Sequence, residues 1–319
     1  MIENKMLAKR RPISMELLMP VVSIVLVFVP IVILRPRVLN YLGIYLLLNM
    51  AIPLVLATIA QMFAMTIGEI DFSLGNLISL VTCIVGTTLS KNPLLAISML
   101  IGILAIYTIF GALLYLRNLQ SIVVTIGLSF IWTGIAIIIQ PSPGGNVPSW
   151  LVKMMQYKPP LVPMPLIFMI VAALALILIL FRTKFGVLLR GIGGNKKAVE
   201  QSGHSVVKVQ MLVFFLVGLF GILSGAALAG ITTSADARIA QNYTLIAVAS
   251  VLLGGGSFSG GTVSAVGVVL GACTMTMVGT LLTFLKVSPD WQIGTQGIII
   301  LVVLFVNSQL KKKGRVRYV

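Results

Sequence analysis

Two acidic residues, Glu69 and Asp71, lie between long apolar stretches of the sequence, where ionisable side chains are rare. A lipid-facing acid at bilayer depth costs about 2.5 to 3.5 kcal/mol on the insertion scale. Both acids must therefore reach water, a basic group or backbone amides. Asp71 can accept the free amides at the start of a following helix, with Ser73 beside it, which is a capping role. Proton relay by Glu69 and Asp71 is the alternative chemistry.

These acids belong to a segment that occurs twice. The segment GEIDFSLG at 68–75 aligns with GGGSFSGG at 254–261, with identities at two glycines, a phenylalanine and a serine. Broken backbone of this kind is tolerated at membrane depth only against protein or a water-filled cavity. The alternative is ordinary short turns with small-residue packing. The candidate pore or broken-helix residues are Gly68, Glu69, Asp71, Ser73, Gly75, Gly254, Ser257, Ser259 and Gly261.

No catalytic or nucleotide-binding motif accompanies these residues. The sequence has no GxxxxGKS/T phosphate-binding loop, no HExxH and no paired-cysteine site. Its two cysteines, Cys83 and Cys273, lie within apolar runs, and its single histidine, His204, cannot form a metal site alone. We therefore expect no enzyme activity, no catalytic residue, no metal and no cofactor in this chain.

The longest polar stretch within the apolar sequence runs over 182–208, RTKFGVLLRGIGGNKKAVEQSGHSVVK, and six of its residues are basic. Its tripeptide GGN is expected to break the chain. Asn195 can cap a new helix, and Gly203 can end that helix in the left-handed conformation. These signals predict a short helix over 196–202. Isolated helices below roughly 12 residues are marginal in water, so this one is expected to dock on a partner.

The composition places these segments in a membrane. The 319 residues are 58% hydrophobic and 9% charged, with a mean hydropathy of +1.10, whereas soluble domains contain about 25% charged residues. Apolar runs long enough to cross a bilayer recur along the chain. The sequence therefore predicts an all-α, polytopic membrane protein. The ten predicted spans lie near 17–34, 41–67, 73–90, 94–116, 120–139, 163–181, 209–230, 243–256, 262–285 and 292–308.

The distribution of basic residues predicts the orientation. With the N-terminus in the cytoplasm, 16 of the 23 lysines and arginines fall on the cytoplasmic side. Both termini and the 182–208 loop are then cytoplasmic. The connection at 140–163 faces outward, either as a linker or as a docking surface for an external partner. Six predicted spans separate the two GEIDFSLG-like segments, so both face the same way. Nucleic-acid binding is not expected, since no compact basic domain is present.

Three stretches together resemble a known family. They are GEIDFSLG at 68–75, FRTKFGVLLRGIGGNKKAVEQSG at 181–203, and LLGGGSFSGGTVSAVGVVLGA at 252–272 followed by SPDWQ at 288–292. In order and spacing they are similar to the inner-membrane permease subunits of bacterial ABC importers of the ribose, xylose and simple-sugar type. The similarity covers 15–308.

The resemblance implies one transmembrane permease domain over 1–319, lying in lipid of the bacterial inner membrane. It implies three protein partners: a cytoplasmic ATPase subunit that hydrolyses ATP, a periplasmic solute-binding protein, and a second permease subunit in a homo- or heterodimer. The cargo is expected to be a simple sugar or a similar small polar solute, with nucleosides and amino acids left open. A proton-coupled secondary transporter that uses Glu69 and Asp71 is the alternative.

Within the 182–208 loop, the resemblance implies that 193–203 matches a coupling helix seated in a groove of the ATPase. We expect Ala198 and Val199 to be the apolar anchors of this helix. The sequence departs from the family pattern at Glu69, where glycine is usual, and at the lysine pair 196–197, where acids are common. The candidate coupling residues are Gly193, Gly194, Asn195, Lys196, Lys197, Ala198, Val199, Glu200 and Gly203.

Overall fold

The computed structural model describes residues 13–288, 291, 294–295, 297–298 and 301. Apart from one backbone bridge between Gly144 and Ala235, the regular structure in these residues is helical, which confirms the predicted all-α class. The elements are α1 (Ile13–Leu34), η1 (Pro36–Leu39), α2 (Tyr41–Asn49), α3 (Ala51–Thr66), α4 (Leu74–Cys83), η2 (Ile84–Leu89), α5 (Pro93–Leu116), α6 (Ser121–Ile139), α7 (Ser149–Met155), α8 (Met164–Arg182), α9 (Lys184–Gln201), α10 (Val206–Thr232), α11 (Tyr243–Leu253) and α12 (Ala265–Phe284).

The apolar runs of the sequence correspond to helices. In the described part of the chain, six helices are long and apolar enough to cross a membrane: Tyr41–Thr66, which joins α2 and α3, and α5, α6, α8, α10 and α12. Three shorter apolar helices occupy Leu18–Leu34, Leu74–Leu89 and Tyr243–Leu253. These nine match the first nine predicted spans. The predicted tenth span at 292–308 and the basic clusters at both termini lie outside the described residues.

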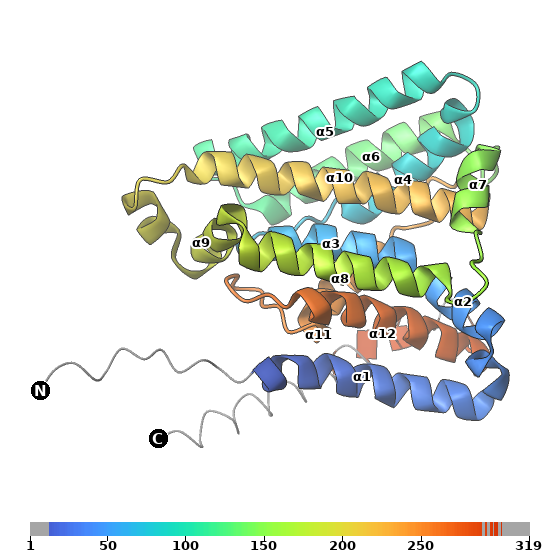
Figure 1. Cartoon of the computed structure of the whole chain (residues 1–319). Coiled ribbons are helices and arrows are strands. Elements are labelled where there is room, and N and C mark those ends of the chain that lie inside the picture. The colour runs from blue at the N-terminus through green and yellow to red at the C-terminus, as the bar shows by residue number, and fades with distance from the viewer. Residues whose placement is uncertain (1–12, 289–290, 292–293, 296, 299–300, 302–319) are drawn as a thin grey trace, which may run out of the picture.

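The helices form one bundle around α3, every residue of which is buried. The yellow helix α10 packs on α3, α4 and α5, while α12 packs on α1, α3, α8 and α11 (Figure 1). Helices α5, α6 and α8 turn large apolar side chains such as Ile109, Phe130 and Ile170 outward. In a bilayer these side chains face lipid, which explains why the outer helices are apolar on every side.

Two of the helices, α4 and α11, cross only part of the bundle, and they begin beside each other. The Gly75 amide donates to the Thr244 hydroxyl at 2.8 Å, and the Ala240 amide donates to the Ser79 hydroxyl at 3.0 Å. A β-carbon at Gly75 would collide with the Ala240 carbonyl oxygen. The predicted breaks near 68–75 and 254–261 are present. A further non-helical segment, 233–242, lies before α11.

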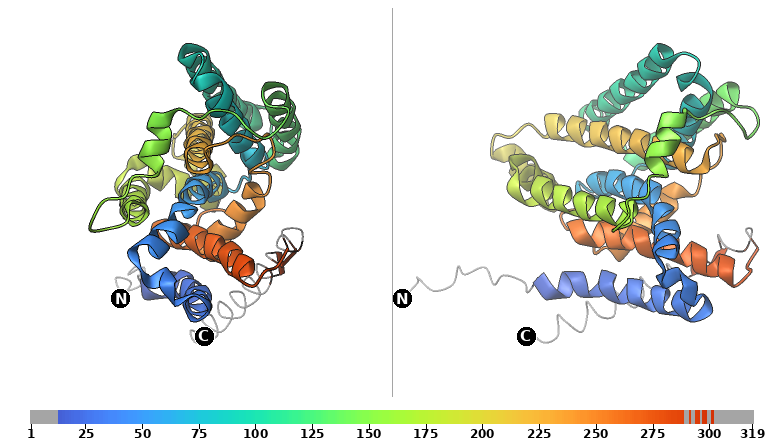
Figure 2. Two further views of the ribbon diagram at one scale, coloured as in Figure 1. Left: turned by 90° about the vertical axis from the view of Figure 1, so that its right-hand side faces the viewer. Right: turned by 45° about the vertical axis from the view of Figure 1, so that its right-hand side comes forward.

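The bundle has two distinct ends. Helix α9 lies at one end, together with the start of α1, whereas α2 and α7 lie at the other (Figures 1 and 2). The 140–163 connection, expected to form an outer surface, is held in place by backbone bonds. The backbone amides of Gly144 and Ala235 each donate a hydrogen bond to the other residue's carbonyl oxygen, at 2.9 and 2.6 Å. The Asn146 amide donates to the Gly86 carbonyl oxygen at 2.6 Å. These bonds make the connection a fixed part of the fold.

Candidate functional site

The segment 67–73, between α3 and α4, is non-helical backbone held by side chains of two helices. From α6, the Ser121 hydroxyl accepts the Ile70 amide at 3.3 Å, and the Thr125 hydroxyl accepts the Phe72 amide at 2.9 Å. From α3, the Gln61 amide group, in the orientation that satisfies both partners, pairs with the Asp71 peptide at 3.2 and 3.3 Å. Backbone groups that cannot reach water are thereby satisfied by protein.

Asp71 is fully buried, and its carboxylate is surrounded by donors. It accepts from the Ser73 amide at 2.7 Å, from the Ser73 hydroxyl at 2.6 Å and from the Tyr107 hydroxyl of α5 at 3.0 Å. The sequence had suggested a cap on the free amides of the following helix. The carboxylate instead accepts hydrogen bonds from the amide and hydroxyl of Ser73, the residue that precedes the first turn of α4. Tyr107 was not among the residues predicted from the sequence, because a single tyrosine within an apolar run does not indicate a polar contact.

The two acids have different surroundings. Glu69 is partly exposed, and within the described chain no hydrogen bond joins its carboxylate to that of Asp71. Gly68, which precedes it, has a φ of +85°, a conformation that favours glycine. The hydrogen bonds of Asp71 thus hold it at the start of α4, and none that the structure describes pairs its carboxylate with Glu69.

Three segments that are distant in the sequence meet where α3 ends. The Gly261 amide donates to the Thr66 carbonyl at 2.9 Å. A β-carbon at Gly193 of α9 would overlap both the Thr66 carbonyl oxygen and the Gly261 nitrogen. A β-carbon at Gly260 would lie 2.9 Å from the Gly68 nitrogen and 3.0 Å from Gly193 Cα. We call this set, Thr66, Gly68, Gly193, Gly260 and Gly261, the glycine contact.

The glycine contact brings the three sequence stretches that carry the family resemblance into one place. Gly260 and Gly261 have φ values of +79° and +75°, so their backbone conformation as well as their small size favours glycine. Backbone approaches backbone here without intervening side chains. At Gly193, α9 is therefore in direct backbone contact with the end of α3 and with the loop before α12.

Helix α9 differs from the predicted short helix. Its N-cap Thr183 accepts the Gly186 amide at 3.1 Å, and the helix continues through Gly193 and Gly194, which were expected to break the chain. The break is at Asn195 alone, with φ −157° and ψ 94°. The unpredicted first part is stabilised by tertiary packing, since its Leu189 and Ile192 are buried, and this packing overrides the low helix propensity of glycine.

The second part of α9, which we call the 196–201 helix, is bounded by the two residues that were predicted to start and end it. Asn195 Oδ1 accepts the Ala198 amide at 3.1 Å, and Gly203 has a φ of +81°. Lys197 and Ala198 are exposed. Val199, in contrast, is half-buried and packs on the permease's own core, close to Gly191. Ala198 is thus the more accessible of the two expected anchors, and contact of either with a partner stays a prediction.

The charged residues of the 196–201 helix contact α5. The Tyr115 hydroxyl donates to Glu200 Oε1 at 2.8 Å, and Lys196 Nζ lies 4.5 Å from the centre of the Tyr115 ring. Lys196 and Glu200 were expected to set the charge match with a partner. Both also have contacts within this chain, but Glu200 is exposed and Lys196 partly exposed, so their charge match with a partner stays a prediction. Lys197 is exposed as well. Nothing in the sequence had indicated a role for Tyr115.

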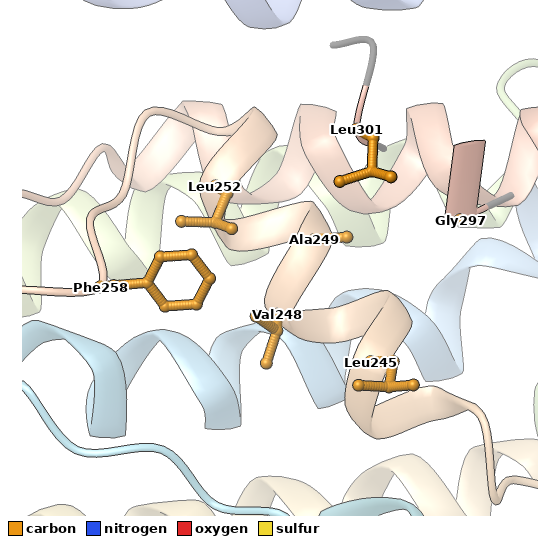
Figure 3. A pocket seen from close by; sticks show the side chains of 7 residues that line it. All are labelled: Leu245, Val248, Ala249, Leu252, Phe258, Gly297 and Leu301. Atoms are coloured by element: carbon orange, nitrogen blue, oxygen red, sulfur yellow. The ribbon is translucent and has the colours of Figure 1, made fainter. Parts of the chain in front are cut away.

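The second broken segment differs from the first in its polar groups. Ser257 and Ser259 are joined through their hydroxyls at 3.0 Å, and Gly254 packs against the backbone of Gly267. Phe258 lines an open hollow of about 340 Å³ on α11 (Figure 3). The described residues around it are Leu245, Val248, Ala249, Leu252, Phe258, Gly297 and Leu301. None of these described side chains can hydrogen-bond a polar solute.

Comparison with known proteins identifies the family. A protein-family profile described as "Branched-chain amino acid transport system / permease component" matches residues 43–304. The chain belongs to this permease family. The family consists of transport subunits, so the permease is not an enzyme, as the sequence resemblance implied. No solved structure matches the permease.

Several curated relatives are import permeases for sugars. The permease is 36% identical to the ribose import permease protein RbsC of Bacillus subtilis over 146 residues, which are 46% of this chain and 45% of that protein. It is 26% identical to RbsC of Escherichia coli over 250 residues, which are 75% and 77% of the two chains. It is 30% identical to the xylose transport system permease protein XylH of Haemophilus influenzae over 152 residues, 48% and 40% of the two chains. The matches to the first and third relatives thus span less than half of those proteins.

Proposed function

We propose that this chain is the membrane permease subunit of an ATP-driven importer that carries a simple sugar or a similar small polar solute into a bacterial cell. Its membership of a permease family and its similarity to ribose, galactose and xylose permeases support this proposal. In this function ATP is hydrolysed by a separate cytoplasmic subunit. A solute-binding protein delivers the cargo, and a second permease subunit completes the pathway.

The observation that carries the proposal is the geometry of α9. The 196–201 helix presents Lys197 and Ala198 to solvent at one end of the bundle. The same α9 is in backbone contact with the end of α3 at Gly193. An ATPase that binds the exposed face can bias the permease only if it interacts differently with two conformations. The backbone contact at Gly193 would pass such a bias from α9 to the bundle.

The proposal predicts that Ala198→Glu abolishes assembly with the ATPase. A bulky acid at this exposed position blocks a partner's groove, yet it touches no buried group of the permease. The variant should therefore insert and fold normally but lose more than about 90% of ATPase copurification and of uptake in proteoliposomes, as for loss of a central interface contact. Membrane yield and elution volume in detergent report on folding.

His204→Glu is the matched control, because it adds the same charge to the same loop beyond the end of the helix, at another exposed position. It should assemble and transport normally. Wild-type assembly and uptake in Ala198→Glu would contradict the proposal. Uptake by the purified permease alone, driven by a proton gradient, would favour the proton-coupled alternative.

We also propose that the α9 end of the bundle is cytoplasmic and that the permease lies in the inner membrane. Cysteine labelling in intact cells tests this orientation. A cysteine at position 142, in the exposed 140–163 connection, should react with an impermeant thiol reagent, whereas a cysteine at position 204 should not. The native Cys83 and Cys273 are buried, so they give little background. Labelling of position 204 from outside would reverse the proposed orientation.

A further inference from the structure

We propose that Tyr115 is a positioning residue that fixes the 196–201 helix to α5, so that force on this helix moves the bundle. The inference rests on the proposed function. It concerns a contact within the permease, and it assigns Glu200 and Lys196 to that contact instead of to the ATPase.

The contact has a specific geometry. The Tyr115 hydroxyl donates to Glu200 Oε1 at 2.8 Å, and the Lys196 ammonium lies 4.5 Å from the centre of the same ring. Lys196 and Glu200 are one helical turn apart, so both project from the same face of the 196–201 helix. One tyrosine thus holds two side chains of that face, with a hydrogen bond to a charged acceptor and a cation–π contact.

The 196–201 helix needs this attachment because of the break at Asn195. Asn195 has non-helical dihedral angles, which interrupt the backbone hydrogen bonding of α9 between the glycine contact and the 196–201 helix. Beyond this break the 196–201 helix is held by Val199, which packs on the core, and by its chain connection to α10. Tyr115 adds an attachment from a different element, α5, and this attachment opposes rotation of the helix about Asn195.

Tyr115 also connects the 196–201 helix to Asp71. Tyr107 lies two turns earlier on α5, about 12 Å along the helix. Its hydroxyl donates to Asp71 at 3.0 Å, and its ring stacks on Trp132 with centroids 6.2 Å apart. Helix α5 therefore joins the 196–201 helix to the 67–73 segment through two tyrosines.

The glycine contact reaches the same segment by a separate route. Gly193 touches Thr66 and Gly260, and Gly260 in turn lies against Gly68. The two parts of α9 are thus connected to the two ends of 67–73, one through α5 and the other through backbone contact. A rigid displacement of α9 moves both ends together. If the 196–201 helix instead turns about Asn195, neither end of the 67–73 segment is displaced effectively.

Tyr115→Phe tests the inference, because it removes the hydroxyl and keeps the ring that faces Lys196. In the assembled transporter we expect unchanged ATPase copurification and a fall in solute uptake per ATP hydrolysed of about two- to tenfold, the range of a single hydrogen bond. Tyr157→Phe, at an exposed tyrosine of the outer connection, is the matched control and should leave this ratio unchanged. A wild-type ratio in Tyr115→Phe would overturn the inference, and so would loss of copurification.

Substitutions of Glu200 separate contact with Tyr115 from contact with the ATPase. Glu200→Gln keeps an acceptor oxygen and should retain most of the coupling, whereas Glu200→Ala should match Tyr115→Phe. The double variant Tyr115→Phe/Glu200→Ala should then be no worse than either single variant. Additive losses in the double variant would show that Glu200 acts elsewhere, and they would overturn the inference.

A measurement without any partner distinguishes failure of this inference from failure of the proposed function. A spin label at position 197, which is exposed, reports the mobility of the 196–201 helix in the purified permease. Tyr115→Phe should increase that mobility. Unchanged mobility would overturn the positioning role, whereas increased mobility in a permease that binds no ATPase would support the positioning and contradict only the proposed function.

Discussion

Gly193→Ala should reduce solute uptake at least about tenfold, whereas Gly194→Ala should have almost no effect. A β-carbon at Gly193 overlaps the backbone of Thr66 and of Gly261, and neither can move as a flexible side chain could. Overpacking of this kind costs about 1 to 3 kcal/mol. The strain separates α9 from the end of α3, so we expect uptake to fall to about a tenth of wild type or less.

Gly194 is the matched control because it is the next residue of the same helix and is exposed, with no atom within 4 Å of a β-carbon built there. Alanine at position 194 should stabilise the helix slightly, by about 0.5 to 1 kcal/mol. Uptake in proteoliposomes, ATPase copurification and the thermal midpoint should be measured for both variants. Equal uptake by the two variants would show that the close approach at Gly193 has no role in transport.

Asp71→Leu should destabilise the permease strongly, and Asp71→Asn should not. Leucine leaves the Ser73 amide and two hydroxyls without their acceptor in a fully buried place. Each unsatisfied buried group costs about 1 to 3 kcal/mol. The Ser73 and Tyr107 hydroxyls are 2.8 Å apart and can pair with each other, so we expect a total loss of about 2 to 5 kcal/mol. The thermal midpoint and the yield of inserted protein measure this loss.

The Asn variant separates the structural role of Asp71 from proton relay. An amide oxygen still accepts from Ser73, and its nitrogen can donate to the Tyr107 oxygen. Asp71→Asn should therefore keep most uptake, with the same dependence on pH as wild type. A folded Asp71→Asn protein that does not transport at any pH would show that the ionisable group itself is needed.

The sequence alone determined the features that depend on local pattern. Apolar runs predicted nine apolar helices in the described part of the chain, six of them long enough to cross a bilayer, because length and apolarity are properties of each segment by itself. Glycine and serine clusters predicted the breaks near 68–75 and 254–261. Asn195 and Gly203 predicted the termini of the 196–201 helix, since caps depend on residues within a single turn.

Tertiary structure decided how these pieces meet. Thr66, Gly193 and Gly261 are in contact although long stretches of chain separate them, and a glycine has no side chain whose polarity could indicate a neighbour. Tyr107 and Tyr115 lie on a helix that is apolar on every side, so its sequence gives no face on which to expect a polar contact. The first part of α9 is helical because it packs on α3 and α8, and such packing outweighs the local propensity of its glycines.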